Sequence, residues 1–414
     1  MHVAIIYDGV PNSETGGGAF CVFSLSKSLR QMGNNVTALL VIDKKILNPE
    51  TERRLKIYQS VVDSTHIVFT KNKALSFFDK IINKFSFTLG SLYPEVGCAD
   101  EVRDVIQKVK PDVVFVFHFQ ALAAAYKIKD VPKITIVGDP PFSVMKYRFL
   151  FFLKRLDLKH IFLLPFYPIL YFKNKKFTKD LLNSCEKKGA VAYHHAQEFD
   201  RLGAGPCKYY PIPISDLIGI KNNFDCVRPE KKKFKILLLG HLKGIVAVTG
   251  MALFAEVILP ILSREIGEDN LEVSIVGSYF DDLPNKLRKK LMSNCVKVKG
   301  HLEVIDEEFF SSDVFLVPTP IRLGIRVRII TAMSYGSLIV AHAANKSGIP
   351  ELEDGENCLL SSSGEELAQK IIDCYNNKYN ISKIRTNARA TFEKYFEASR
   401  ATAVIVDDLK KMID

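Results

Sequence analysis

Short apolar runs alternate with stretches of helical periodicity along the chain. In the first half, the predicted strands are residues 2–7, 36–42, 112–118, 133–137 and 191–194. A helix is predicted over residues 19–32, between the first two of these strands. Apolar strands of this length are typical of a parallel sheet covered by helices on both faces. The pattern therefore predicts a doubly wound α/β domain.

The second half repeats this alternation after a proline-rich break at residues 211–229. Its predicted strands are residues 234–239, 272–276, 296–299, 313–317, 338–341 and 358–360. A break in composition between two such series indicates a domain boundary. We therefore expect one domain over residues 1–215 and a second over residues 230–395.

The chain has 414 residues, a net charge of +11 and a pI of about 9.1. This charge favours an anionic partner, such as a nucleotide, a nucleic acid or an anionic membrane surface. The eight cysteines are scattered and form no metal-binding pair, which is typical of reduced thiols. The N-terminus reads as a strand, and no apolar run is expected to span a bilayer. We expect a cytoplasmic protein without a metal site.

A glycine-rich turn with two arginines follows the predicted strand 313–317. Gly324 opens it, Arg326 and Arg328 follow, and an apolar helical run ends at Gly336. Free N–H groups at a helix N-terminus beside cationic side chains favour binding of a phosphate group. The alternative is a solvated basic first turn on a core helix. The motifs elsewhere in the chain favour the phosphate site.

Three features of the first half are further site candidates. Gly17 and Gly18 open the first helix, although the G-x-G-x-x-G spacing of a dinucleotide site fails. His118 ends an apolar strand, and Asp139 follows the next strand, so both lie where ligands bind on such sheets. The alternatives are a flexible turn at the glycines, a capped core histidine, and a plain turn at Asp139.

The segment 146–179 interleaves aromatic residues with lysines and arginines and contains one acid, Asp157. Prolines interrupt it, so it cannot be one long helix. Such a segment suits the headgroup layer of an anionic membrane. An internal helical hairpin with a solvated basic face fits equally well. Nucleic acid is a weaker candidate, because no nucleic-acid module accompanies the segment.

The second half resembles the donor domain of retaining glycosyltransferases of family 4. That family often shows the run G-x-R-x-K-x-x-E-A-M-A-x-G-x-P-V-V, which is matched here by Gly324, Arg326, Arg328, Ala332, Met333, Gly336, Ile339 and Val340. The family elements G-x-P-E and D-G-x-N appear in full at residues 348–351 and 354–357. In the first half, Gly17, Gly18 and His118 match the family more loosely.

The resemblance implies a GT-B fold, in which two Rossmann-like domains face each other across a cleft and the last helix, here residues 396–414, packs back on the first domain. It implies that Arg326 and Arg328 hold the diphosphate of a UDP- or GDP-sugar, with Gly17, Gly18 and His118 near the sugar. We add Lys243 and Thr331 as donor-binding candidates, and His118 and Asp139 as catalytic candidates. The implied acceptor is a glycan or lipid-linked glycan. No metal or cofactor beyond the nucleotide-sugar is implied, and segment 146–179 suggests peripheral attachment to the inner face of a membrane.

The chain departs from the family at two motif glutamates, where it has Leu323 and Thr331. Thr331 can still hydrogen-bond a ribose hydroxyl, whereas Leu323 cannot. Three functions therefore stay open. The first is a retaining glycosyltransferase, the second a catalytically degenerate protein that binds a glycan, lipid or partner, and the third a nucleotide-sugar epimerase.

Overall fold

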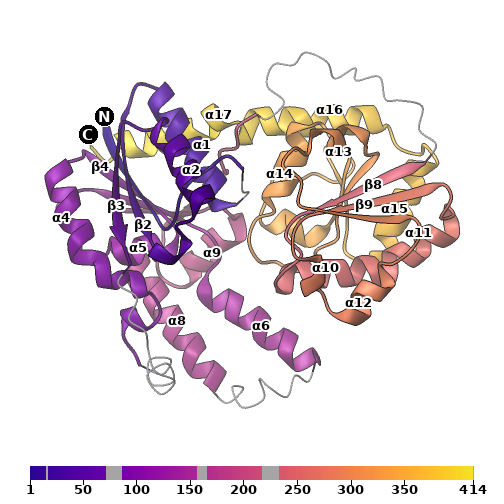
Figure 1. The fold of residues 1–414 in the computed structure, drawn as a ribbon, viewed down its shortest axis with the longest axis horizontal. Coiled ribbons are helices and arrows are strands. Elements are labelled where there is room, and N and C mark those ends of the chain that lie inside the picture. The colour runs from indigo at the N-terminus through magenta and orange to yellow at the C-terminus, as the bar shows by residue number, and fades with distance from the viewer. Residues whose placement is uncertain (15–16, 71–85, 156–165, 217–232, 414) are drawn as a thin grey trace. The chain divides into compact units, whose positions relative to one another are not determined.

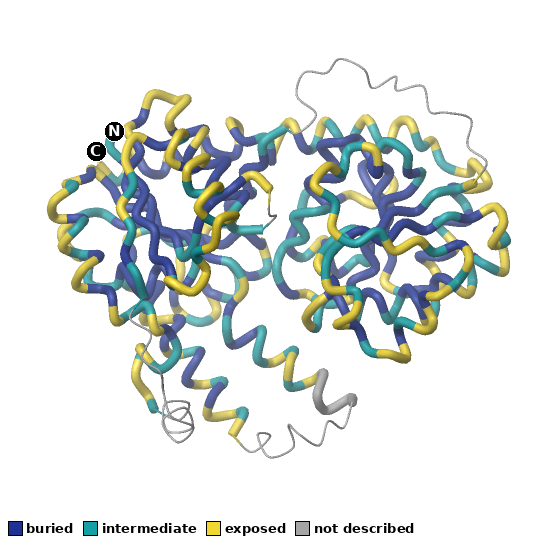
Figure 2. The backbone as a smooth tube through the Cα atoms, in the orientation of Figure 1, coloured by how far each residue is buried: buried dark blue, intermediate teal, exposed yellow. Residues whose placement is uncertain are grey.

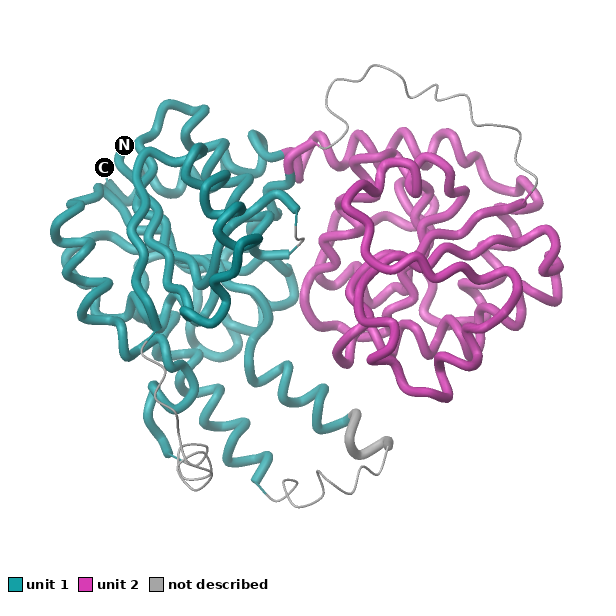
Figure 3. Tube along the Cα trace, viewed as in Figure 1, with its two compact units in different colours: residues 1–214, 398–414 teal, residues 215–397 magenta. Residues whose placement is uncertain are grey.

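The structure, a computed structural model, describes residues 1–14, 17–70, 86–155, 166–216 and 233–413. The chain forms two compact units (Figure 3): residues 1–214 together with 398–414 form unit 1, and residues 215–397 form unit 2. Two predicted features lie outside the described residues: Gly16, which precedes Gly17 and Gly18 in the glycine loop, and residues 156–165 in the middle of the basic aromatic segment.

Unit 1 is built on a parallel sheet of seven strands in the order β3-β2-β1-β4-β5-β6-β7. Figure 1 labels β2, β3 and β4 of this sheet. The strands are β1 His2–Tyr7, β2 Asn35–Ile42, β3 Ser64–Phe69, β4 Val113–Phe117, β5 Lys133–Val137, β6 Lys187–Ala190 and β7 Cys207–Tyr209. The central strands β1 and β4 are almost wholly buried, because helices cover both faces of the sheet (Figure 2). The predicted α/β class is confirmed in this unit.

The helices of unit 1 connect successive strands, and the last one comes from the end of the chain. They are α1 Gly18–Gln31, α2 Pro49–Gln59, α4 Ala99–Val109, α5 Phe119–Ala124, α6 Pro141–Arg155, α8 Tyr167–Leu182, α9 Tyr193–Arg201 and α17 Ala398–Lys410. Their apolar sides are buried against the sheet, as Val102 and Ile106 of α4 show.

One predicted strand was wrong. Residues 191–194 do not form a strand, because the strand there is β6, and α9 begins at Tyr193. The helix starts where His195 N–H donates to Ala192 O, at 3.0 Å. The strands β3 and β7 were not predicted. Both lie at sheet edges, where a strand needs fewer apolar residues and gives a weaker pattern.

Unit 2 has a parallel sheet of six strands in the order β10-β9-β8-β11-β12-β13. The strands are β8 Phe234–Leu239, β9 Leu271–Val276, β10 Val296–Gly300, β11 Val314–Val317, β12 Ile339–His342 and β13 Leu359–Ser361. The helices are α10 Ile245–Leu253, α11 Leu259–Glu265, α12 Asn285–Lys290, α13 Asp306–Ser311, α14 Val327–Ser334, α15 Gly364–Tyr375 and α16 Ile381–Thr391. Both units therefore repeat one topology, as the alternation of the sequence predicted.

The expectation that no apolar run is long enough to span a bilayer was wrong, judged by the length and composition of the helices. Among the described residues, one helix, Ile245–Glu265, is long and apolar enough, because α10 and α11 join through the π-turn Phe254–Ile258. Phe254, Ile258 and Leu262 are fully buried in unit 2, and the helix packs against α15. Pro260 lies in the first turn of α11, where a proline is tolerated, so it does not interrupt this helix.

Asp408 ties the C-terminal helix α17 to the edge of the unit 1 sheet. Its carboxylate accepts hydrogen bonds from Lys208 Nζ at 2.5 Å and from the buried Tyr210 hydroxyl at 2.9 Å, and Lys187 Nζ donates to its main-chain carbonyl oxygen at 2.8 Å. Burial alone would raise the pKa of Asp408, but the hydrogen bonds from Lys208, Tyr210 and Lys187 lower it below its ordinary value. The ionised carboxylate is therefore the form that stabilises unit 1.

We predict that Asp408→Asn lowers the free energy of unfolding of unit 1 by about 2–3 kcal/mol at neutral pH, because it removes hydrogen bonds to a charged group. A lowered pKa contributes stability above the unfolded pKa, which is about 3.9 for aspartate, and loses it as pH falls further. Urea unfolding should thus show the largest difference from wild type at neutral pH and a smaller one in acid. Asp407→Asn is the matched control, since Asp407 is exposed and pairs with Lys411 on its own helix.

Candidate functional site

Each sheet has one place where its strand order reverses, and candidate residues gather there in both units. In unit 1 this place lies between β1 and β4, and in unit 2 between β8 and β11. Loops that leave the carboxyl ends of two such strands diverge, which leaves room for a ligand. Asp8 and the glycine loop follow β1, and His118 follows β4.

His118 is held in a fixed orientation by Asp8. Its Nδ1 lies 3.2 Å from Asp8 Oδ1, and its ring contacts the rings of Tyr7 and Phe117, with centroids 5.5 and 4.5 Å away. The backbone of His118 has φ of 78°, a conformation that non-glycine residues rarely adopt. Since Nδ1 donates to the carboxylate in the neutral tautomer, Nε2 is the nitrogen left for a ligand. The His118 side chain is 29% exposed, so a ligand can reach it.

Gly18 is required by the position of this imidazole. A Cβ atom added at Gly18 would lie 2.3 Å from Cε1 and 2.5 Å from Nε2 of His118. The ring therefore lies directly over the first turn of α1, and Gly17 is the N-cap with φ of 75°. The structure brings three predicted residues together: Gly17, Gly18 and His118.

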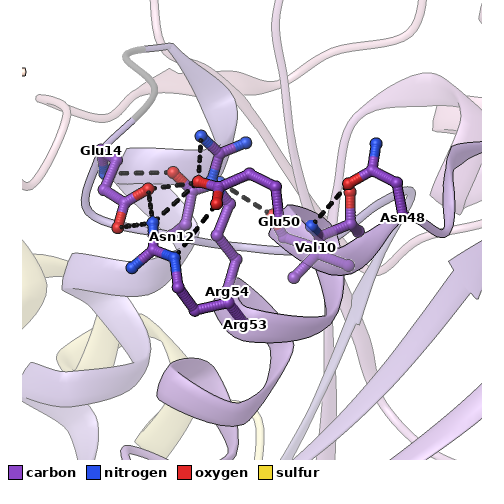
Figure 4. Close-up of polar contacts among 8 residues, drawn as sticks. Val10, Asn12, Glu14, Asn48, Glu50, Arg53 and Arg54 are labelled. Atoms are coloured by element: carbon purple, nitrogen blue, oxygen red, sulfur yellow. Dashed lines mark hydrogen bonds and ion pairs between the residues drawn. The ribbon is translucent and has the colours of Figure 1, made fainter.

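An ion-pair cluster anchors the loop that leads to these glycines (Figure 4). Glu14 accepts from Arg53 Nη2 at 2.5 Å and from Arg54 Nε at 2.9 Å, and both arginines also pair with Glu50 on α2. Within the loop, Asn12 donates to Val10 O at 3.1 Å. The pairing of Glu14 with the two arginines lowers the pKa of its carboxyl. The N–H of Asn12 also donates to Ala19 O of α1 at 3.3 Å, so the loop is tied to both α2 and α1.

A second carboxyl group lies near Asp8. Glu95 comes from the short helix Pro94–Cys98, and its Oε2 is buried without a hydrogen-bond partner among the described residues. Burial, with a contribution from the charge of Asp8, raises the pKa of Glu95 above its ordinary value. This carboxyl group can therefore act as a hydrogen-bond donor at a higher pH than an exposed glutamate.

Asp139 lies one strand away, after β5, in a separate cluster. Its Oδ1 is 3.9 Å from Nδ1 of the fully buried His195 of α9. On the same helix, Glu198 accepts from the Ser143 hydroxyl at 2.8 Å, and burial raises the pKa of Glu198. The two predicted catalytic residues, His118 and Asp139, therefore belong to different clusters.

In unit 2, Arg328 lies over the end of β8. A Cβ atom added at Gly240 would lie 2.3 Å from Arg328 Nη1, and Gly240 has φ of 137°. Arg328 Nη2 donates to Thr319 Oγ1 at 3.3 Å, and Thr319 follows β11. The guanidinium therefore bridges the loops after β8 and β11, at the place where the strand order reverses.

Arg328 is a cation in surroundings that disfavour a cation. Burial, with the positive charge of Arg326, lowers the pKa of Arg328 to about 9. Among the described residues no carboxylate pairs with it. Arg326 is the N-cap of α14 and Arg328 lies in the first turn, at the positive end of the helix dipole. An anion at this point would neutralise positive charge and accept from free helix N–H groups.

At the C-terminal end of α14, two arginines donate hydrogen bonds to the last carbonyl oxygens. Arg385 Nε donates to Gly336 O at 2.7 Å, and Arg389 Nη1 donates to Ser334 O at 2.5 Å. Arg389 also forms an ion pair with Asp216. Cations are stabilising at a helix C-terminus, so these two arginines have a structural explanation that Arg328 lacks.

The two positions that depart from the family motif do not present polar groups to a ligand in the way a glutamate would. Leu323 is 3% exposed and packs in the interior of unit 2. Thr331 is also buried, and its hydroxyl donates to Val327 O of the same helix at 3.2 Å, so only its oxygen lone pairs are left for a ligand.

Lys243 and the D-G-x-N element form ion pairs and hydrogen bonds with other residues of unit 2. Lys243 is exposed and pairs with Asp282 at 3.0 Å, while its Nζ lies 5.0 Å from the centre of the Tyr279 ring. In the D-G-x-N element, Asp354 accepts from Leu360 N–H and Asn357 donates to Glu351 O, both within 2.8 Å. These residues brace the turn before β13, which explains them without a ligand.

Within the described ranges, no three histidines, cysteines, aspartates or glutamates gather as a metal site. The seven cysteines described are free thiols. Sequence reasoning missed three residues that the geometry places in the sites: Asp8, Gly240 and Thr319. Each lies within two residues of the end of a central strand. The ends of the strands at the two points where the strand order reverses could therefore have pointed to these residues.

The whole chain superposes on several solved structures. A glycosyltransferase of Rickettsia africae ESF-5 matches with a TM-score of 0.68 and 14% identity, over 100% of this chain and 98% of that one. Anabaena HepE, solved with UDP and glucose, matches with a TM-score of 0.68 and 17% identity, over 99% and 100%. The fold is GT-B. The predicted fold class is thus confirmed for both units.

Within this GT-B chain, residues 233–377 match the family model for glycosyl transferases group 1. The lipopolysaccharide outer core galactosyltransferase WaaB also shares the fold, with a TM-score of 0.59 and 14% identity, over 99% of this chain and 100% of that one. No curated protein matches the chain. The matched residues contain both arginines of the α14 site.

We predict that two partly buried arginines, Arg328 and Arg389, respond oppositely to replacement by methionine. Arg328→Met should leave the free energy of unfolding of the ligand-free protein unchanged or raise it by up to about 1 kcal/mol, because it removes a partly buried cation that pairs with no carboxylate among the described residues. Arg389→Met should lower it by about 2 kcal/mol, because it removes the charged hydrogen bonds of Arg389 to Asp216 and to Ser334 O. Urea unfolding of both variants tests this. A strong loss of stability in Arg328→Met would show that Arg328 has a structural role instead.

Proposed function

We propose that this GT-B protein is a glycosyltransferase that moves a hexosyl group from a UDP- or GDP-sugar to a glycan or lipid-linked acceptor, with retention of configuration. The observation that carries the proposal is Arg328, a partly buried cation at a helix N-terminus with no carboxylate partner among the described residues. The match of residues 233–377 to group 1 glycosyl transferases supports it. The UDP and UDP-glucose complexes of HepE support a uridine nucleotide as donor.

The chemistry assigned to unit 2 is neutralisation of the leaving group. The bond between the anomeric carbon and the diphosphate oxygen breaks, and its electron pair leaves with the nucleoside diphosphate. Arg326, Arg328 and the first N–H groups of α14 stabilise this developing charge. Fixed cations can supply the charge that a divalent ion supplies elsewhere, so we propose a reaction without a metal.

The chemistry assigned to unit 1 is orientation of the sugar. In the tautomer set by Asp8, His118 Nε2 accepts a hydrogen bond from a sugar hydroxyl, and the lack of a side chain at Gly18 lets the ring lie against α1. The acceptor hydroxyl oxygen bonds to the anomeric carbon on the face that the diphosphate leaves, and its proton passes to the departing phosphate. Asp139 and its neighbours on α9 are assigned to acceptor binding.

A degenerate GT-B protein is the second candidate, because Leu323 is packed in the interior and the Thr331 hydroxyl is engaged within its helix. Restoring glutamate at these buried positions would bury a carboxylate and destabilise unit 2, so it is a poor test. Donor hydrolysis under single-turnover conditions separates the candidates directly. Binding of a nucleotide-sugar without release of the nucleoside diphosphate, with any acceptor offered, favours the degenerate protein, and a changed sugar without transfer indicates an epimerase.

We predict that UDP or GDP stabilises the protein against thermal unfolding, by roughly 2.7 kcal/mol at a hundred times its Kd. Arg328→Met should abolish this stabilisation, since the main anion contact is lost, and EDTA should leave it unchanged. The matched control is Lys290→Met, which removes one positive charge from α12 far from α14 in sequence. An equal nucleotide effect in wild type and Arg328→Met would refute the diphosphate site.

We predict that Gly18→Ala lowers kcat by about 100-fold, because the added methyl group displaces the His118 ring. The stabilisation by nucleotide should persist, since Gly18 is assigned to the sugar. Gly90→Ala is the control, because a Cβ atom there meets no atom within 4 Å. Transfer assays with UDP- and GDP-sugars give kcat. Full activity in Gly18→Ala would contradict a role of His118 at the sugar.

A further inference from the structure

The helix α8 of unit 1 has one face that packs on the protein and one that does not. Leu170, Asn174, Phe177 and Leu181 are buried, and they recur at the spacing of a single helix face. The helix α6 packs beside α8 (Figure 1). The core of unit 1 is therefore complete without the outward face of α8.

The outward face carries a large exposed aromatic residue among lysines. Phe172 is 65% exposed, which is high for a phenylalanine, and Ile169 is 44% exposed one turn earlier. Lys176 and Lys179 follow Phe172 by one and two turns and are exposed too. Residues three to four apart on a helix are neighbours on its surface, so these four residues form one face, which we call the α8 face.

The neighbouring helix extends this chemistry. On α6, Lys146 and Arg148 are exposed, and Leu150 is 43% exposed. Among the described side chains of α6 and α8, Lys146, Arg148, Lys176 and Lys179 are exposed cations, and Asp180 is the exposed acid. Exposed apolar side chains surrounded by cations suit a partner that is apolar inside and anionic outside.

We propose that the α8 face docks on an anionic phospholipid surface, with Phe172 and Ile169 in the headgroup–acyl boundary and Lys176 and Lys179 at the lipid phosphates. The charge complementarity selects this occupant. The aliphatic side chains of Ile169 and Leu150 cannot stack on nucleic-acid bases, but their transfer from water into a lipid layer is favourable. The proposal concerns attachment only and does not depend on sugar transfer.

The test uses the absence of tryptophan from the chain. In the full-length Phe172→Trp variant, the new indole is the single tryptophan. With vesicles of phosphatidylglycerol and phosphatidylcholine at low salt, its emission should shift to the blue and become protected from a soluble quencher. With pure phosphatidylcholine the effect should be weaker. The control is Met292→Trp in unit 2, since Met292 is 79% exposed and its indole should stay in water.

Vesicle sedimentation measures the contribution of the cations. Lys176→Gln with Lys179→Gln should lower partitioning onto anionic vesicles by roughly thirtyfold, from about 1 kcal/mol per lysine. Lys286→Gln with Lys289→Gln removes the same charge from exposed positions of α12 and should have no such effect. Thermal unfolding of each variant in solution shows that the fold is kept.

Three results would overturn the proposal. The first is no sedimentation of wild type with anionic vesicles at low salt. The second is a blue shift for Met292→Trp but not for Phe172→Trp, which would place the docking surface elsewhere. The third is a blue shift of Phe172→Trp that grows with protein concentration without vesicles, which would make a second copy the partner. None of these outcomes involves a sugar donor, so failure here is distinct from failure of the transferase proposal.

Discussion

The strand order of the two sheets is the constraint on which both candidate sites depend. In each unit the chain starts a sheet at its centre, builds outward to one side, and then returns to build on the other. The two central strands therefore send their following loops in opposite directions. The side chains at this point, Asp8 with His118 in unit 1 and Arg328 with Thr319 in unit 2, meet because the topology leaves space there.

Close approach at these points demands glycine. Gly18 admits an imidazole and Gly240 admits a guanidinium, each at a distance where any side chain would collide. A larger residue at either position would not remove the functional group itself, but it would displace it. In this way the backbone selects the geometry of the site before any polar contact is made.

Sequence reasoning located the alternation of strands and helices well, because buried parallel strands give continuous apolar runs. It failed for β3 and β7 at the sheet edges. It also failed for residues 191–194, because β6 ends at Ala190 and α9 begins at Tyr193. Of the site, it named His118, Gly18 and Arg328 but not Asp8 or Thr319. A lone aspartate or threonine after a strand has no distinctive spacing, and the partners lie 110 and 9 residues away in sequence. The environments of Leu323 and Thr331 also needed coordinates, because sequence gives the residue type and not the direction of the side chain.

The C-terminal helix α17 belongs to unit 1, although all of unit 2 precedes it in the chain. Unit 2 is thus an insertion within unit 1 in the covalent sense. During synthesis, residues 215–397 leave the ribosome as one continuous segment and can fold before α17 is made. The hydrogen bonds of Lys208 and Tyr210 to Asp408 can form only after α17 has emerged. A nascent chain stalled before residue 398 would hold all of unit 2 but only part of unit 1.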